Sequence, residues 1–119
     1  GDAIKAQPVL PQRHMLYFDK GSTRITAQSR ADWQKVLADI RARKSVDITV
    51  SGHADTVSSD RINDTLARKR AETVARMLRD AGVNAAAISV ESFGARELQV
   101  PTPPQTSELR NRRVVVTVR

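Results

Sequence analysis

Residues 46–55 read VDITVSGHAD, a sequence that combines the pattern of a β-strand with a polar turn. Apolar and polar residues alternate strictly over residues 46–51, and such alternation predicts a strand with one buried face. The turn ends on Asp55, so a carboxylate is placed at the carboxyl end of this strand. Ligands of α/β sheets tend to bind in that region. We therefore expect a half-buried strand and a candidate binding position here.

A helix is predicted on the carboxyl-terminal side of this strand, over residues 62–81, after a polar loop at residues 56–61. Its apolar positions include Leu66, Val74, Met77, Leu78 and Ala81. The helix is expected to stop at Gly82, because glycine readily adopts the backbone conformation that follows a helix end.

The amino-terminal part predicts a strand and a helix. The apolar, aromatic run HMLYF predicts a strand at residues 14–18, and the turn cluster at residues 19–22 ends it. A helix is then predicted from Thr26 or Ser29 to about Arg43. One apolar stripe on this helix is formed by Trp33, Val36, Leu37 and Ile40. We assign this stripe to the core.

Two more strands are predicted at residues 88–93 and 112–118, on either side of a long loop with three prolines. The predicted order is therefore β-α-β-α-β-β. Such an order predicts an α+β fold, a two-layer α/β sandwich with two main helices packed on one face of a mixed four-stranded sheet. We interpret residues 1–12 as a lead-in arm or linker and residues 13–119 as one domain.

Composition narrows the classes of partner and chemistry. Twenty Lys and Arg residues against 13 Asp and Glu residues give a formal net charge of +7, which favours anionic partners. The charge is equally consistent with a basic surface that has no specific partner. With no cysteine and two histidines, the chain is expected to have no disulfide, no cysteine nucleophile and no dedicated metal site.

The sequence contains no membrane-spanning segment, because no run approaches the ~20 apolar residues that a membrane helix needs. The chain begins with Gly1 and Asp2 rather than with methionine. We interpret it as a piece of a longer protein, whose missing part would hold any membrane anchor.

Arg70 is an unusual residue of the second predicted helix, because it lies on or beside the apolar stripe, four residues after Leu66 and four before Val74. A charge there is costly unless it is paired or stays hydrated at the domain edge. Asp55 is its natural acidic partner. The two residues could form a structural ion pair, which the pattern alone favours. They could instead hold a zwitterion, with the carboxylate binding an ammonium and the guanidinium binding a carboxylate.

Ordered motifs over most of the chain resemble the OmpA-like C-terminal domain family, which includes domains of outer membrane protein A, peptidoglycan-associated lipoprotein and MotB-type stator proteins. The family pattern G-H-T-D…N-x-x-L-S-x-x-R-A-x-x-V is similar to Gly52-His53-Ala54-Asp55, Asn63, Leu66, Arg70-Ala71 and Val74. Two shorter motifs, N-R-R-V and F-x-x-G-S, resemble Asn111-Arg112-Arg113-Val114 and Phe18…Gly21-Ser22. The chain departs from the family pattern at Ala54, Ser58, Ile62 and Ala67.

The resemblance implies a function: non-catalytic binding of peptidoglycan through the diaminopimelate of its stem peptide, which anchors a parent envelope protein in the periplasm. It implies that Asp55 and Arg70 bind the charged ends of diaminopimelate and that Asn63 lines the site. Thr56, Asp19 and Ser22 are further candidates with less support. No cofactor is implied, and a homodimer stays open.

The alternative hypothesis is a basic nucleic-acid-binding α/β domain. It depends on the net charge and on basic residues along the second helix, namely Arg61, Arg68, Lys69, Arg76 and Arg79. Only four aromatic residues are present, and they do not form the stacking platform of RNA-binding modules, so we expect no nucleic-acid partner.

An enzyme is not expected, because the chain lacks G-x-S-x-G, H-E-x-x-H, G-x-G-x-x-G and Walker motifs. A peptidoglycan amidase or glycosidase is a third, weaker hypothesis. We interpret His53 as a turn residue with a local hydrogen bond. Arg112 and Arg113 are expected to flank the last strand and to pair with surface acids, with Arg112 as a further candidate for the cleft.

Overall fold

A computed structural model describes residues 10–119 of the chain, so most of the arm expected over residues 1–12 lies outside the described residues. The predicted order β-α-β-α-β-β is confirmed. The elements are β1 (Gln12–Tyr17), α1 (Ala27–Arg43), β2 (Ile48–His53), α2 (Asp60–Asp80), β3 (Ile88–Gly94) and β4 (Arg113–Val118). Two short 3₁₀ turns, η1 (Ala85–Ala87) and η2 (Leu109–Asn111), precede β3 and β4.

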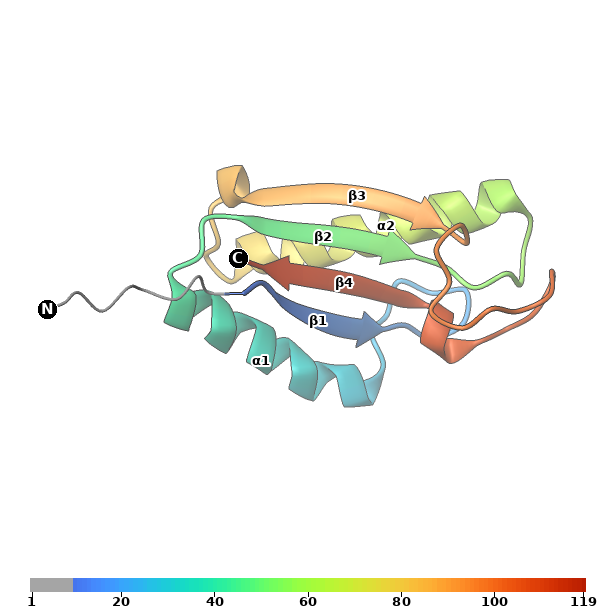
Figure 1. Ribbon diagram of the computed structural model, residues 1–119, viewed down its shortest axis with the longest axis horizontal. Coiled ribbons are helices and arrows are strands. Elements are labelled where there is room, and N and C mark those ends of the chain that lie inside the picture. The colour runs from blue at the N-terminus through green and yellow to red at the C-terminus, as the bar shows by residue number, and fades with distance from the viewer. Residues whose placement is uncertain (1–9) are drawn as a thin grey trace, which may run out of the picture.

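The four strands form one mixed sheet in the order β1-β4-β2-β3. The last strand, β4, lies between β1 and β2 and is antiparallel to both, whereas β2 and β3 are parallel. Both helices cover the same face of this sheet, as Figure 1 shows. The predicted two-layer α+β sandwich is therefore confirmed.

The boundaries of β2 differ from the prediction. The strand begins at Ile48 rather than at residue 46, and Val46 is 81% exposed. The pairing of β2 with β4 begins at Ile48 and Val118, with one more backbone hydrogen bond from the Arg119 N–H to Asp47 O at 3.1 Å, so Val46 lies outside the pairing. The alternation still assigned the faces correctly, because Ile48 and Val50 are both buried.

Helix α2 begins two residues earlier than predicted, because the Ser59 side chain accepts a hydrogen bond from the Ile62 backbone N–H and caps the helix. Its buried face consists of Asn63, Ala67, Arg70, Ala71, Val74, Ala75 and Leu78. The prediction of its apolar stripe was therefore partly wrong: Leu66 and Met77 are half-buried, and Ala81 is exposed.

Close packing of α2 on β2 explains this rotation of the helix. Gly52 faces Ala67 and Ala71, and a Cβ added to Gly52 would collide with the Ala67 carbonyl oxygen. Small residues on both elements allow the backbones to approach, so the alanine side of the helix turns to the sheet and Leu66 moves toward its edge.

Helix α1 matches its prediction, with Thr26 as the capping residue. Val36, Leu37 and Ile40 are buried in the core, and Trp33 packs against it while half-exposed. The rest of the core comes from the strands and α2, and its fully buried members include Leu16, Phe18, Ile48, Val50, Val74, Leu78, Val114, Val116 and Val118. Neither helix has the length and apolar character that a membrane-spanning helix requires, within the described residues.

The loops that follow β1, β2 and β3 gather at one end of the sheet, opposite the end where the carboxyl terminus lies (Figure 1). Strands β1, β2 and β3 end there, and β4 begins there. Residues that follow three strands and precede the fourth therefore meet, although they lie far apart in the sequence.

Candidate functional site

Arg70 is fully buried on the sheet-facing side of α2. Its guanidinium donates to three backbone carbonyls: Nε to Ser22 O at 2.9 Å, Nη1 to His53 O at 3.3 Å and Nη2 to Asp19 O at 3.2 Å. The guanidinium carbon lies 5.4 Å from the centroid of the Phe18 ring. Arg70 thus connects the turn after β1 to the end of β2.

The charge of Arg70 is held in an unfavourable environment. Burial lowers the pKa of this guanidinium to about 10, an effect that nearby Asp55 opposes and nearby Arg112 reinforces. Arg70 is still protonated at neutral pH, but its hydrogen-bond partners are neutral carbonyl groups. Within the described residues it forms no ion pair.

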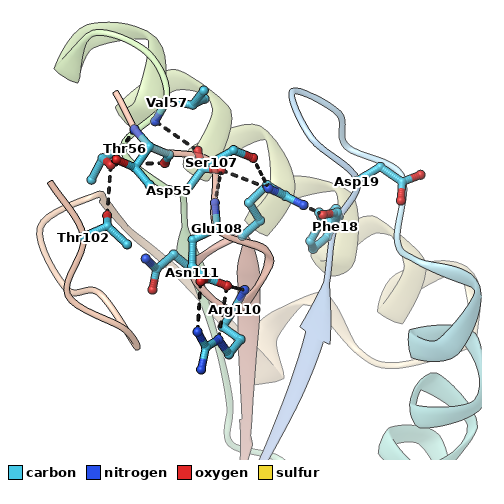
Figure 2. Close-up of polar contacts among 12 residues, drawn as sticks. Phe18, Asp19, Asp55, Thr56, Val57, Thr102, Ser107, Glu108, Arg110 and Asn111 are labelled. Carbon is cyan, nitrogen blue, oxygen red and sulfur yellow. Dashed lines mark hydrogen bonds and ion pairs between the residues drawn. The ribbon is translucent and has the colours of Figure 1, made fainter. Parts of the chain in front are cut away.

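Asp55 is also buried, with 2% of its surface exposed, and its ion-pair partner is Arg112. Its Oδ2 accepts from Arg112 Nη1 at 3.1 Å and from the Glu108 N–H at 3.1 Å, and its Oδ1 accepts from the Val57 N–H at 3.3 Å. Figure 2 shows Asp55 between Val57 on its own loop and Ser107 and Glu108 on the loop before β4. The expected direct pair with Arg70 is therefore wrong.

Arg112 completes the cluster from the start of β4. Its Nε donates to Phe18 O at 3.0 Å, and its Nη1 also donates to Ser107 Oγ at 2.8 Å. Asp55, Arg70 and Arg112, which we call the charge cluster, thus hold together the ends of β1 and β2, the middle of α2 and the residue that precedes β4. They bring one negative and two positive charges into a largely buried site.

Two predictions about neighbouring residues were wrong. Arg112 and Arg113 do not pair with surface acids: Arg112 pairs with buried Asp55, and Arg113 Nη2 donates to Glu97 O at 3.2 Å. His53 is the last residue of β2 rather than a turn residue, and its buried ring stacks on Phe93 with centroids 5.3 Å apart. Burial, reinforced by the charge of Arg113, lowers the pKa of His53 to about 4.

The other candidate residues hold the loops around the charge cluster. Asn63 is buried, and its Nδ2 donates to Ser58 O at 2.9 Å. Thr56 Oγ1 lies 2.7 Å from the Pro103 carbonyl oxygen, to which it donates, and connects two loops. Asp19 and Ser22 contribute their carbonyls to Arg70, and Asp19 itself is exposed.

Two open pockets adjoin this region. One, of about 320 Å³, lies between the turn after β1 and the first half of α2 and is lined by Gly21, Val57, Ser58, Arg61, Ile62, Thr65, Leu66 and Lys69. The other, of about 380 Å³, includes Thr56, Asn63 and Thr102 in its lining. All six predicted site residues therefore meet at one end of the sheet, but Asp55 and Arg70 lie beneath the surface rather than in an open cleft.

Sequence reasoning missed the contribution of the loop before β4. Ser107 and Glu108 hold Asp55 and its partner, and nothing in their local sequence pattern indicates this role. Arg112 was a weaker candidate because of its place in the run Asn111-Arg112-Arg113-Val114. Its partner Asp55 is 57 residues away in the chain, so only the position of β4 in the sheet reveals the contact.

The chain is similar in sequence to known envelope proteins. The chain is 29% identical over 101 residues to the outer-membrane lipoprotein YfiB of Pseudomonas aeruginosa, covering 85% of this chain and 60% of that protein. It is 37% identical over 67 residues to the peptidoglycan-associated lipoprotein of Legionella pneumophila, covering 56% of this chain and 38% of that protein. The chain thus spans three fifths or less of the length of these two relatives.

Solved structures share the fold. The peptidoglycan-associated lipoprotein of Burkholderia pseudomallei superposes with a TM-score of 0.76 at 26% identity, covering 89% of this chain and 90% of that chain. The OmpA-like domain of FopA1 from Francisella tularensis gives a TM-score of 0.78 at 22% identity, covering 91% and 71%. Residues 17–112 match the OmpA family itself, from the end of β1 to the start of β4. With its motifs, its fold and this match in agreement, the chain belongs to the OmpA family.

Proposed function

We propose that this chain is a non-catalytic domain that binds peptidoglycan through the diaminopimelate of the stem peptide and anchors a parent envelope protein to the cell wall in the periplasm. The observation that carries the proposal is the charge cluster of Asp55, Arg70 and Arg112 at the loop end of the sheet. Two relatives are peptidoglycan-associated lipoproteins by name, which supports the choice of ligand.

The charge cluster matches the chemistry of the free end of a diaminopimelate side chain. That end carries an ammonium and a carboxylate on one carbon, so it needs one anionic and one cationic partner close together. Asp55 supplies the anion. Arg70 is the cation best suited to the carboxylate, because its present partners are three neutral carbonyls and its charge is not matched by an acid. A ligand carboxylate would relieve this imbalance.

The turn after β1 controls access to the charge cluster in the proposed complex. The carbonyl oxygens of Asp19 and Ser22 accept two of the hydrogen bonds that the Arg70 guanidinium donates. Gly21, which lies between them in the chain, lines the 320 Å³ pocket. Gly21 has a positive φ of 63°, and the space around its Cα is open. A shift of this turn would exchange carbonyl partners of Arg70 for the ligand carboxylate without moving the core.

A pair of small ligands tests this proposal without altering the protein. The tripeptide L-Ala-γ-D-Glu-meso-diaminopimelate should shift the backbone amide NMR signals of Ser22 and Asp55. The same tripeptide with lysine in place of diaminopimelate should not, because the lysine side chain ends in an ammonium without a carboxylate for Arg70. Loss of one charge-assisted contact worth about 1.5–3 kcal/mol corresponds to at least a ten-fold drop in affinity. Equal shifts with both compounds, or none with the diaminopimelate tripeptide, would contradict the proposed ligand.

A second experiment addresses the wall itself and the rival functions. The domain should sediment with purified sacculi of the diaminopimelate type and release no soluble sugar or peptide from them. Nucleic acid should not compete for the domain at physiological salt, and any weak association should vanish steeply as salt rises. Release of fragments would indicate an enzyme, and salt-resistant nucleic-acid binding without sacculus binding would favour the alternative.

A further inference from the structure

The 320 Å³ pocket beside the charge cluster has features that diaminopimelate binding does not use. Its floor is apolar, with Val57 from the loop after β2 and Ile62 and Leu66 from α2. Ile62 is 56% exposed, so its side chain offers apolar surface to a ligand in this pocket. Arg61 and Lys69 stand at the two ends of this apolar floor.

Arg61 and Lys69 present two cations that are not neutralised by an ion pair among the described residues. Both side chains are exposed. The nearby acids of α2 have other surroundings: Asp60 lines the 380 Å³ pocket, Asp64 pairs with Arg96, and Glu72 borders a different pocket with Arg68. No carboxylate contributes to the lining of the 320 Å³ pocket. Arg61 and Lys69 therefore make the edge of this pocket complementary to negative charge.

The spacing of the two cations suggests the kind of ligand. Eight residues of α-helix separate their Cα atoms by roughly 12 Å. A stem peptide has two free carboxylates on either side of diaminopimelate, one on the D-isoglutamate before it and one on the terminal D-alanine after it. Three residues in an extended conformation span roughly 10 Å, so the carboxylates and the cations are similarly spaced. The methyl group of D-alanine would suit the apolar floor.

We infer that Arg61 and Lys69 bind these two flanking carboxylates, so the domain selects stem peptides whose carboxylates are free over stem peptides in which they are amidated. This inference rests on the proposed function, since the charge cluster must first position the diaminopimelate. The two cations set specificity within the ligand class. Both cations are exposed, so each contact between a cation and a ligand carboxylate contributes about two- to five-fold in affinity, and salt weakens this contribution.

The test compares three ligands by isothermal titration: free meso-diaminopimelate, the tetrapeptide L-Ala-γ-D-Glu-diaminopimelate-D-Ala, and the same tetrapeptide with its D-Glu and D-Ala carboxylates amidated. Wild type should prefer the free tetrapeptide over the amidated one by about five- to twenty-fold. The double variant Arg61→Gln/Lys69→Gln should lose this preference and keep its affinity for free diaminopimelate.

A matched control removes the same amount of charge elsewhere on α2. Arg68→Gln/Arg76→Gln alters two exposed residues that do not line this pocket, and it should keep the wild-type preference. Equal affinity of wild type for both tetrapeptides, with free diaminopimelate still bound, would refute this inference and leave the proposed function intact. Failure of all three ligands to bind wild type would refute both.

Discussion

Replacement of Asp55 by alanine is the most informative perturbation of the charge cluster. The carboxylate is 2% exposed and accepts hydrogen bonds from Arg112, from the Val57 N–H and from the Glu108 N–H. Asp55→Ala leaves the Arg112 guanidinium, whose side chain is 11% exposed, without its counter-ion. It also leaves two backbone donors unpaired at the start of loops.

The expected cost follows from these contacts. Removal of one partner of a buried ion pair typically lowers the free energy of unfolding by roughly 3–5 kcal/mol, because the remaining charge is buried without a counter-ion. The two loop N–H groups add a penalty that water reaching the loops would reduce. We expect a loss of about 3–4 kcal/mol in the free energy of unfolding. Domains of this size have about 5–15 kcal/mol, so the variant should still fold.

Urea unfolding of a double-mutant cycle measures this cost. In Asp55→Ala/Arg112→Leu the stranded charge is absent, so the double variant should be more stable than the sum of the two single effects predicts, by about 2 kcal/mol. Arg110→Gln is the matched control, since it removes an exposed partner of Glu108 and should leave the midpoint near wild type. A loss below about 1 kcal/mol in Asp55→Ala, or strict additivity in the cycle, would refute this reasoning.

Three further predictions concern the scaffold. Gly52→Ala should lower the free energy of unfolding, measured with urea, by about 1–3 kcal/mol, because the added Cβ meets the Ala67 carbonyl oxygen. A variant as stable as wild type would show that the helix can move away. Ser59→Ala should cost about 1 kcal/mol in urea through loss of the α2 cap, and an unchanged midpoint would argue against this cap. His53 has a pKa of about 4 in the folded protein, below its ordinary value, so the free energy of unfolding should fall by about 2 kcal/mol as the pH drops from about 6.5 to 4. His53→Gln should flatten this pH dependence in urea titrations, and an identical slope would exclude His53 as its source.

Local sequence patterns determined the elements and, for β2 and α1, their buried faces. The alternation in VDITVSGHAD identified β2 with its buried side chains, and the apolar stripe identified α1, because strand and helix periodicities are properties of a few consecutive residues. Arg70 was recognised from the same periodicity as a charge on a core-facing position, and it is fully buried. The same patterns predicted the order of the elements, β-α-β-α-β-β.

The tertiary structure alone decided how the charges are paired. β4 is the last strand in the chain but lies between β1 and β2, and this places Arg112 beside Asp55, 57 residues away. Arg70 is thereby left with carbonyl partners from the turn after β1. Ion-pair partners depend on distances in space, whereas periodicity reports only which face of an element a residue occupies. The boundary of β2 has the same origin, since it depends on where pairing with β4 begins, at Ile48 and Val118, rather than on the alternation itself.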